Sequence, residues 1–214
     1  MIRQTRRHIN WQAPLNLNNQ LRRLSLDSCK RAIDVALAFA LILLLSPLFV
    51  AIAFIVKISS KGSVLHWSDR VGKDNRMFRM PKFRSMRTGT PQLATHLLSD
   101  PSVYLTPIGP FLRRTSLDEL PQLFSILKGD MSFVGPRPAL FNQDDLVALR
   151  TKLDIQVLAP GLTGWAQING RDELPNPVKV QFDYEYLQRR SLMFDCYVIF
   201  ATVLRVARGN GIKH

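Results

Sequence analysis

One uncharged stretch near the N-terminus constrains the fold of this 214-residue chain more than any other feature. Residues 35–56 contain no charged side chain, and Leu, Ala, Ile, Phe and Val fill nearly all of the positions. This run exceeds the roughly 18 apolar residues that mark a candidate transmembrane helix. It lies too deep in the chain for a secretory signal peptide, and no small-residue cleavage site follows it. We therefore expect a membrane segment.

Two features distinguish this segment from a plain spanning helix. Ser46 and Pro47 lie in its middle, and a proline inside a helix removes a backbone hydrogen bond and forces a kink. Both flanks are basic, and an excess of Lys and Arg assigns both ends to the cytoplasm. A re-entrant helix, broken at Ser46-Pro47 and returning to the leaflet it entered, satisfies both features, with the Ser46 hydroxyl serving the freed backbone groups. An ordinary kinked span is the alternative.

The whole sequence predicts one helix-rich α+β domain with a membrane anchor. We expect a basic N-terminal arm over residues 1–29, a re-entrant membrane helix over residues 30–57 and a single globular domain over residues 58–214. Alternating apolar residues predict a small β-hairpin, and helical spacing predicts several helices. The strands are expected at 64–67 and 75–86, and the helices at 111–127, 142–152, 178–190 and 192–206. The last two are amphipathic, or apolar but too short to span, so they belong in the core or at the membrane interface.

The chain is strongly basic, with 29 Lys and Arg against 16 Asp and Glu and a net charge of +13. Such a charge implies a polyanionic partner, and nucleic acid, an anionic membrane surface and phosphorylated small molecules all qualify. Cys29 and Cys196 lie far apart without metal-ligand spacing, which favours a reducing, cytosolic environment.

Residues 113–122 contain the pair of side chains best suited to chemistry. Asp118 and Glu119 are adjacent and follow Arg113 and Arg114. Adjacent acids repel each other, and burying either is costly unless a cation or a metal compensates. The alternative is an ordinary helix start, in which Ser116 caps the helix and both acids lie in its first turn.

Basic residues elsewhere form candidate phosphate-binding groups. Lys82 and Arg84 lie in the second predicted strand, where a solvated basic face is the alternative. Arg137 lies between Pro136 and Pro138, which fix its backbone near the extended region. This rigidity lowers the entropic cost when a guanidinium binds a phosphate, although a structural turn with a solvated arginine has the same sequence.

Several motifs, taken together and in order, resemble those of one family. They are residues 30–34, the Pro47 break, and residues 69–72, 82–86, 116–122, 129–132, 135–138 and 160–167. The chain resembles the bacterial sugar transferases, the monotopic polyprenyl-phosphate phosphoglycosyl transferases that start glycan assembly. The resemblance runs from about Lys30 to Arg205. Larger members carry an additional multi-span N-terminal region, so the chain resembles the minimal form that has the catalytic domain alone.

The resemblance implies transfer of a sugar-1-phosphate from a UDP-sugar to undecaprenyl phosphate, with release of UMP. It implies a covalent route in which Asp118 attacks the β-phosphorus, and Mg²⁺ bound at Asp118 and Glu119. The implied location is the cytoplasmic face of a bacterial inner membrane, in contact with phospholipid. The glycan (capsule, exopolysaccharide, O-antigen or glycoprotein), the sugar and the oligomeric state stay open, with a homodimer as one option.

Elementary electrostatics agrees with this reaction. A carboxylate that attacks a diphosphate brings several negative charges together, so cations must neutralise them. Mg²⁺ commonly binds one or two carboxylates together with substrate phosphates. We expect the clamp on the diphosphate to consist of Lys82, Arg84, Arg113 and Arg137.

The chain also departs from the family pattern at positions away from the dyad. Ser63 replaces a common proline, residues 66–68 (His-Trp-Ser) replace a more usual aromatic or glutamine pattern, and Ala139 follows Pro-Arg-Pro. These differences bear on sugar choice or loop shape. Two rival functions remain: a membrane-anchored nucleic-acid binder, which has no use for the acidic pair and lacks an aromatic platform, and a scaffold protein without chemistry. We expect no nucleic-acid partner.

Overall fold

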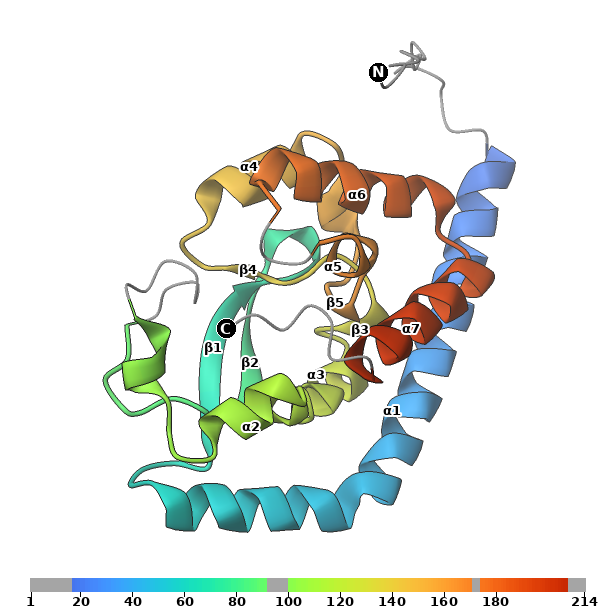
Figure 1. Cartoon of the computed structure of the whole chain (residues 1–214). Helices are drawn as coiled ribbons and strands as arrows, with labels where there is room; N and C mark the ends of the chain where they lie inside the picture. The colour runs from blue at the N-terminus through green and yellow to red at the C-terminus, as the bar shows by residue number, and fades with distance from the viewer. Residues whose placement is uncertain (1–16, 92–99, 171–173, 208–214) are drawn as a thin grey trace.

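The computed structural model describes residues 17–91, 100–170 and 174–207, and within them the chain forms a helix-rich α+β domain (Figure 1). The helices are α1 (Leu17–Ser59), α2 (Gly109–Arg114), α3 (Gln122–Lys128), α4 (Asp144–Thr151), α5 (Trp165–Ile168), α6 (Asn176–Arg189) and α7 (Leu192–Ala207). The strands are β1 (Leu65–Val71), β2 (Met77–Phe83), β3 (Ser132–Val134), β4 (Ala139–Leu140) and β5 (Gly161–Thr163). Short 3-10 turns are η1 (Lys73–Asn75), η3 (Pro101–Tyr104), η4 (Leu117–Glu119) and η5 (Ile155–Val157). The predicted fold class is confirmed at this level, whereas residues 1–16 of the predicted arm lie outside the described residues.

Two small sheets organise the domain. β1 pairs antiparallel with both β2 and β4, whereas β3 and β5 pair in parallel. β1 and β2 are the predicted hairpin. Their register places His66 opposite Lys82 and Arg70 opposite Phe78, and because side chains alternate along a strand, all four share one face. Phe78 turns its end of that face toward the core, Arg70 and Lys82 are half-buried, and His66 is exposed.

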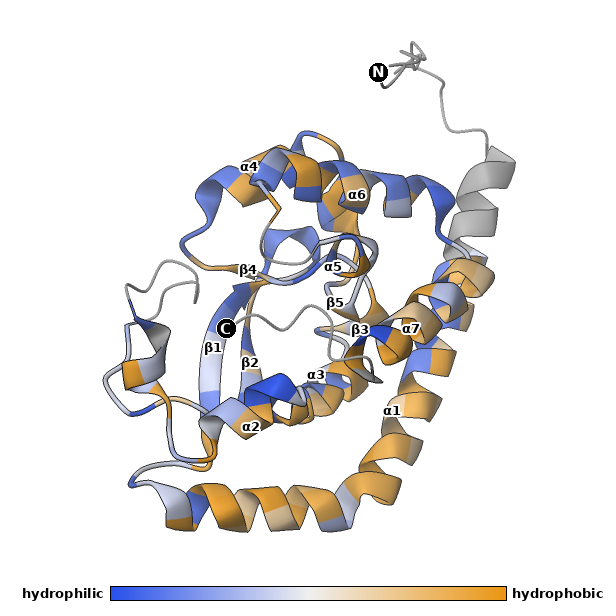
Figure 2. Ribbon diagram, in the orientation of Figure 1, coloured by the Kyte–Doolittle hydropathy of each residue, from blue (hydrophilic) through white to orange (hydrophobic). Residues whose placement is uncertain are grey.

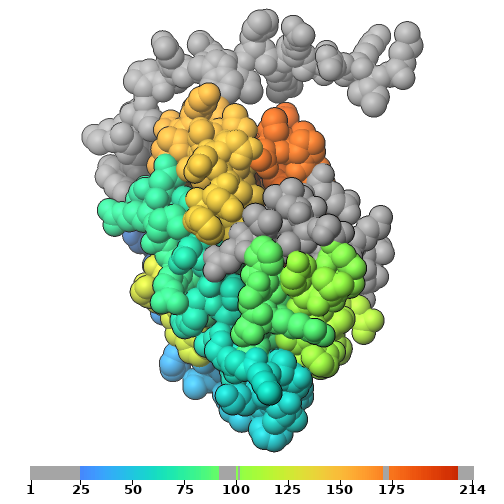
Figure 3. All heavy atoms as spheres, turned by 90° about the vertical axis from the view of Figure 1, so that its left-hand side faces the viewer, coloured from blue at the N-terminus to red at the C-terminus, as the bar shows by residue number. Residues whose placement is uncertain are grey.

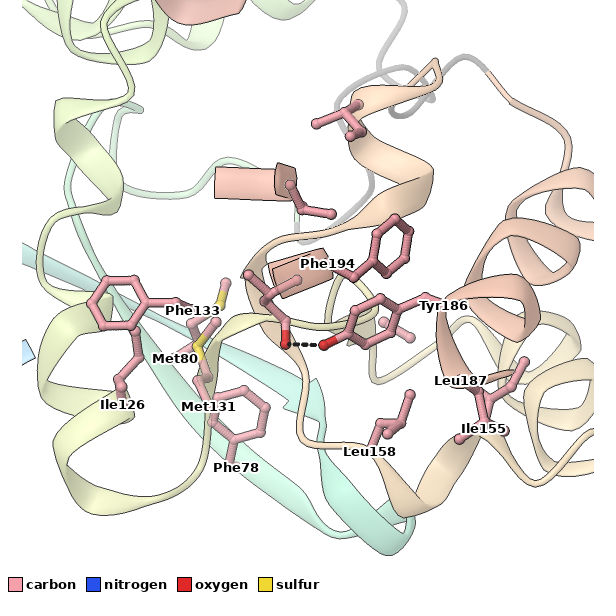
Figure 4. Packing of buried hydrophobic residues seen from close by; sticks show 14 of the residues in the cluster. Phe78, Met80, Ile126, Met131, Phe133, Ile155, Leu158, Tyr186, Leu187 and Phe194 are labelled. Atoms are coloured by element: carbon pink, nitrogen blue, oxygen red, sulfur yellow. Dashed lines mark hydrogen bonds between the residues drawn. The ribbon is translucent and has the colours of Figure 1, made fainter. Parts of the chain in front are cut away.

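The main hydrophobic core joins β2 and β3 to the C-terminal helices (Figure 4). Its labelled members are Phe78, Met80, Ile126, Met131, Phe133, Ile155, Leu158, Tyr186, Leu187 and Phe194. The Tyr186 hydroxyl lies 2.7 Å from Asp195 Oδ1 and 3.2 Å from the Val134 carbonyl oxygen, so its polar end is satisfied inside the core. The helices predicted at 142–152, 178–190 and 192–206 are α4, α6 and α7, which supply one side of this core.

Helix α1 bends partway along its 43 residues, and the cause is local (Figure 1). Pro47 has no N–H, so it cannot bond the carbonyl oxygen four residues earlier, which belongs to Leu43. Ser46 Oγ donates to that same carbonyl oxygen at 2.8 Å and replaces the missing bond. The predicted role of the Ser46 hydroxyl is therefore confirmed. The predicted break is corrected to a bend, because α1 remains one continuous helix.

The two arms of α1 pack on different parts of the domain. Before the bend, Ala38 is fully buried in the main core. Beyond it, Ile52 and Val56 form a second cluster with Phe83 and Leu112. Figure 3 shows the far, cyan end of α1 at the bottom of the molecule, beneath the green segment that contains α2. The helix therefore wraps two sides of one domain.

Most of the coloured part of α1 is hydrophobic (Figure 2). Residues Ser25–Ser59 form the helix that is long and apolar enough to cross a membrane in the described part of the chain. Large exposed side chains include Leu44 (73% exposed), Val50 (70%) and Phe54 (64%). Water is a poor solvent for so continuous an apolar surface, so this face is suited to lipid.

Polar contacts tie the charged residues just before the apolar segment 35–56 to the globular domain. At the N-terminal side, Arg31 donates to the carbonyl oxygens of Ile126 and Leu127 at the end of α3, where the helix dipole favours a cation. Nearby, Lys30 Nζ lies 2.6 Å from Asp195 Oδ2 in α7. The buried Asp34 accepts a hydrogen bond from the backbone N–H of Phe133 at 3.3 Å. These contacts explain why charged residues stand at the edge of an apolar segment.

Candidate active site

The segment that carries the acidic pair is a broken helix rather than a continuous one. The apolar spacing predicts one helix over 111–127, but α2 ends at Arg114 and η4 separates it from α3. Ser116 occupies the N-cap position of η4 and both acids lie in its first turn, as the helix-start alternative predicts, but its backbone is left-handed (φ 56°) and its side chain makes no capping bond. A left-handed serine costs about 1 kcal/mol or more, which the surrounding contacts must offset. The turn places Asp118 and Glu119 on η4.

Asp118 is buried, with only 7% of its surface exposed. Burial raises the pKa of its carboxyl group from 3.8 to about 6, and the charge of Glu119 adds to this rise. The charges of Lys82, Arg113 and Arg137 act in the opposite direction. Asp118 is thus a desolvated carboxylate surrounded by cations, and at pH 7 most of it is ionised.

Two of the predicted cations converge on one oxygen of the neighbouring acid. Lys82 Nζ lies 2.7 Å from Glu119 Oε1, and both side chains are about four-fifths buried. Arg137 Nη2 approaches the same oxygen at 3.7 Å. Lys82 comes from β2 and Arg137 from the loop after β3, so Glu119 joins two elements that are distant in the sequence.

Arg113 completes the group from the last turn of α2. Its charge lowers the pKa of Asp118, which places it within electrostatic range of that carboxylate. The structure therefore brings together five of the six predicted site residues: Lys82, Arg113, Asp118, Glu119 and Arg137.

Arg84, the sixth, does not join the site. It is 4% exposed, and its Nη2 donates to the Ser60 carbonyl oxygen (2.7 Å) and hydroxyl (2.8 Å) just beyond α1. Carbonyl groups at a helix C-terminus attract cations, and here they hold the guanidinium away from the dyad. The expectation that Arg84 contacts the diphosphate is corrected: it fastens the far end of α1 to β2.

Two residues outside the expected catalytic and substrate-binding set, His66 and Arg70, lie beside the site. His66 faces Lys82 across the hairpin, and burial lowers its imidazole pKa, with further lowering from the charges of Lys82 and Arg70. Arg70 donates from Nη1 to the carbonyl oxygen of Pro138 at 3.2 Å. Hairpin register was the signal for both, since it aligns positions 66 and 70 with the face of Lys82.

The donor set at the dyad fits a hard, oxygen-binding cation. Among the described residues there is no cluster of three or more His, Cys, Asp or Glu side chains that could hold a metal. Asp118 and Glu119 supply two adjacent carboxylates, and Mg²⁺ is commonly bound by one or two carboxylates with substrate phosphates completing its ligands. The site is thus suited to a metal that arrives with a phosphorylated substrate.

Comparison with known proteins places these residues in a family. The model of the bacterial sugar transferase family matches residues 25–209. The chain is 40% identical over 183 residues to the UDP-glucose:undecaprenyl-phosphate glucose-1-phosphate transferase of Escherichia coli, covering 82% of this chain and 39% of that protein. It is 36% identical over 190 residues to the UDP-N-acetylgalactosamine-undecaprenyl-phosphate N-acetylgalactosaminephosphotransferase of Aeromonas hydrophila, covering 86% and 45%.

A shorter relative has a similar length. The exopolysaccharide production protein ExoY of Sinorhizobium fredii is 36% identical over 198 residues, which cover 85% of this chain and 87% of that protein. The chain thus spans less than half of the two longer relatives and most of the shorter one. Because the family model covers more than four-fifths of the sequence, the chain belongs to the bacterial sugar transferase family.

Proposed function

We propose that the protein transfers a sugar-1-phosphate from a UDP-sugar to undecaprenyl phosphate and releases UMP, as the first step in building a glycan. The observation that carries this proposal is the buried Asp118 carboxylate among Lys82, Arg113 and Arg137. This arrangement suits a nucleophile that must approach a polyanionic diphosphate. The names of the relatives support undecaprenyl phosphate as the acceptor but differ in the sugar, so the sugar stays open.

In the proposed first step, an Asp118 carboxylate oxygen attacks the β-phosphorus of the donor. The new bond joins that oxygen to phosphorus, and the bond between the β-phosphorus and the bridging oxygen breaks, so UMP leaves with the electron pair. In the second step a phosphate oxygen of the lipid attacks the same phosphorus and releases Asp118 as a carboxylate. Dividing the transfer in this way lets a soluble donor depart before a membrane-bound acceptor reacts.

We also propose that Mg²⁺ binds at Asp118 and Glu119 together with the diphosphate, where it neutralises charge that develops on the phosphate oxygens. Lys82 and Arg137 hold Glu119 in place for this role through their contacts with Oε1. Chelation by EDTA is expected to abolish UMP release, and added Mg²⁺ to restore it. Full activity in EDTA would remove the metal from the proposal.

The contacts on both sides of the apolar segment 35–56 support a re-entrant membrane anchor on a cytoplasmic catalytic domain. Arg31 contacts α3, and Arg84, the residue after β2, contacts Ser60 just beyond the helix. Both partners belong to one domain, which lies on one side of any membrane. A spanning helix separates its two ends by about 30 Å of hydrocarbon, so it cannot make both sets of contacts. A bent helix that dips into one leaflet can.

Helix α7 is suited to lie at the membrane surface beside this anchor. Its exposed apolar side chains recur at helical spacing: Met193 (81% exposed), Tyr197, Phe200, Val203 and Leu204. Its other face packs in the core through Phe194 and Val198. Contact with phospholipid along α1 and α7 brings the site near the headgroups, where the acceptor phosphate resides.

The deciding experiment measures UMP release by the detergent-purified protein with undecaprenyl phosphate and a panel of UDP-sugars. We expect one or a few donors to give UMP, and the Asp118→Asn variant to give none. Normal activity of the Asp118→Asn variant would contradict the assignment of Asp118 as the nucleophile. Absence of UMP release by the unmodified protein with every donor would contradict the transferase function itself.

A further inference from the structure

The loop that carries Arg137 is held almost entirely through its carbonyl groups. Three consecutive carbonyl oxygens each accept a hydrogen bond: Pro136 from the N–H of Gly161 (2.9 Å), Arg137 from Nη1 of Arg150 (2.9 Å) and Pro138 from Nη1 of Arg70 (3.2 Å). Proline has no N–H, so the flanking prolines remove the donors that would normally secure such a loop. The loop therefore depends on donors from other elements.

One of these donors is itself buried and fixed by a carboxylate. Arg150 lies in α4 with a side chain that is 11% exposed, and its Nε and Nη2 both donate to Asp183 Oδ2 of α6, at 2.9 and 2.7 Å. Asp183 is 2% exposed. The fork of the guanidinium thus uses one edge for Asp183 and a remaining N–H for the backbone of Arg137.

Packing alone does not explain this pair. Two buried charges cost desolvation energy, and apolar side chains of similar volume often serve stability as well or better. An apolar side chain cannot, however, donate to the Arg137 carbonyl oxygen. A small open pocket of about 30 Å³ lies beside the pair and is lined in part by Pro136, Arg150 and Gln156.

We propose that Arg150, oriented by Asp183, is a positioning residue that sets the backbone from which the Arg137 guanidinium reaches Glu119 and the donor phosphates. This inference rests on the proposed function for the identity of the substrate. Arg137 Nη2 lies 3.7 Å from Glu119 Oε1, so a shift of its backbone moves a charge directly at the dyad. Misplacement of a positioning group by about 1 Å can cost about a hundredfold in rate.

A double-mutant cycle separates positioning from general support of the fold. Arg150→Gln is expected to lower kcat/KM for the UDP-sugar about 10- to 100-fold, and Arg137→Gln by a similar or larger factor. If Arg150 acts through Arg137, adding Arg150→Gln to Arg137→Gln lowers kcat/KM by less than about twofold further. Multiplication of the two effects would overturn the proposal.

Controls distinguish a displaced loop from a damaged protein. Arg150→Lys keeps the positive charge but lacks the forked guanidinium, so its kcat/KM should fall nearly as far as that of Arg150→Gln. Arg189→Gln removes an exposed α6 arginine that pairs with Glu185, and it should leave kcat/KM within twofold of the unmodified protein. Where Arg150→Gln unfolds, Asp183→Asn provides the same cycle with Arg150 intact. Full activity of Arg150→Lys would show that position 150 needs only a positive charge, and it would reject the positioning role of Arg150.

A binding measurement makes the inference distinguishable from the proposed function. The four proteins of the cycle (unmodified, Arg150→Gln, Arg137→Gln and the double variant) are titrated with UDP and Mg²⁺ by calorimetry. Non-additive losses of UDP affinity, with no UMP release by the unmodified protein, would keep the inference and reject the transferase function. If the unmodified protein releases UMP normally but the two substitutions act independently on both kcat/KM and UDP affinity, the transferase function stands and the positioning role of Arg150 is rejected.

Discussion

Lys82 Nζ lies 2.7 Å from Glu119 Oε1 and joins the hairpin strand β2 to the turn that carries Asp118. The pair is largely shielded from water, so its attraction is less screened than that of a surface ion pair. Lys82 also lowers the pKa of Asp118, against the effect of burial. Lys82 thus holds Glu119 in place and helps to keep Asp118 ionised.

Lys82→Met is expected to reduce kcat/KM at least a hundredfold at pH 7, because it removes a substrate-facing cation and leaves Glu119 without its nearest partner. The measurement is UMP release across donor concentrations. Lys128→Met, which removes an exposed lysine paired with Asp130, is the matched control and should leave activity unchanged. Equal activity of the two variants would exclude Lys82 from the site.

Asp118→Asn is expected to stabilise the protein while abolishing turnover. The pKa of Asp118 rises from 3.8 to about 6 on folding, so the folded state favours the neutral form. The stabilising contribution of this group is therefore present below about pH 4 and is lost as the pH rises through about 6. At pH 7.5 a neutral isostere should recover up to about 3 kcal/mol, and the gain should vanish near pH 4.

Thermal unfolding of the two proteins at both pH values tests this sign. A lower melting temperature for Asp118→Asn at pH 7.5 would show that the surrounding cations stabilise the carboxylate more than burial penalises it.

Activity is expected to fall as the pH drops through about 6, since the proposed nucleophile is the ionised form of Asp118. In Lys82→Met the acid limb of the profile should move to higher pH, because Lys82 lowers the Asp118 pKa in the unmodified protein. The pH dependence of kcat/KM at fixed Mg²⁺ gives both values. An acid limb that stays in place in the variant would contradict the electrostatic coupling.

Arg84→Met is expected to impair stability far more than catalysis. The variant leaves the Ser60 carbonyl oxygen without its buried donor, at a cost of about 1–3 kcal/mol. Activity per folded molecule should stay within about threefold, unlike that of Arg113→Met. Chemical unfolding combined with UMP release separates the two effects. A large loss of kcat/KM without destabilisation would return Arg84 to the substrate clamp.

The membrane topology is testable with a cysteine on each side of the apolar segment. Cys29 is exposed before it, and Ser63→Cys places a second thiol after it in a background where Cys196 is replaced by Ser. A membrane-impermeant maleimide should label both thiols in inverted vesicles and neither in intact spheroplasts. Labelling from opposite faces would reject the re-entrant anchor in favour of a span.

Local chemistry decided which parts of the fold could be predicted. The bend in α1 follows from Pro47 and the adjacent Ser46, whose effects act within one helical turn. The hairpin likewise follows from alternation along neighbouring residues. The break at Ser116 does not, because the apolar spacing runs on through the turn and only the packed structure selects a left-handed serine.

In the candidate site, too, features set by neighbouring residues could be predicted, whereas those set by distant contacts could not. Asp118 and Glu119 are adjacent in the sequence, whereas Lys82 and Arg84 lie two residues apart in the strand expected at 75–86 and have identical local signals. Their roles differ only because Arg84 contacts Ser60, just beyond α1 and 24 residues earlier in the chain. The Arg150–Asp183 pair joins two helices across 33 residues and had no local signal at all.

The contacts of Lys30 and Arg31, just before the apolar segment, impose an order on the synthesis and folding of this protein. The partners of Arg31 lie 95 and 96 residues further along the chain, and the partner of Lys30 lies 165 residues further. The apolar helix therefore leaves the ribosome long before the surfaces that receive it are synthesised. Under the proposed membrane anchoring, the helix enters the lipid during that interval, before Lys30 and Arg31 have met their partners. On that proposal, the globular domain completes its fold around an anchor that is already in place, which makes its folding a late event guided by the membrane.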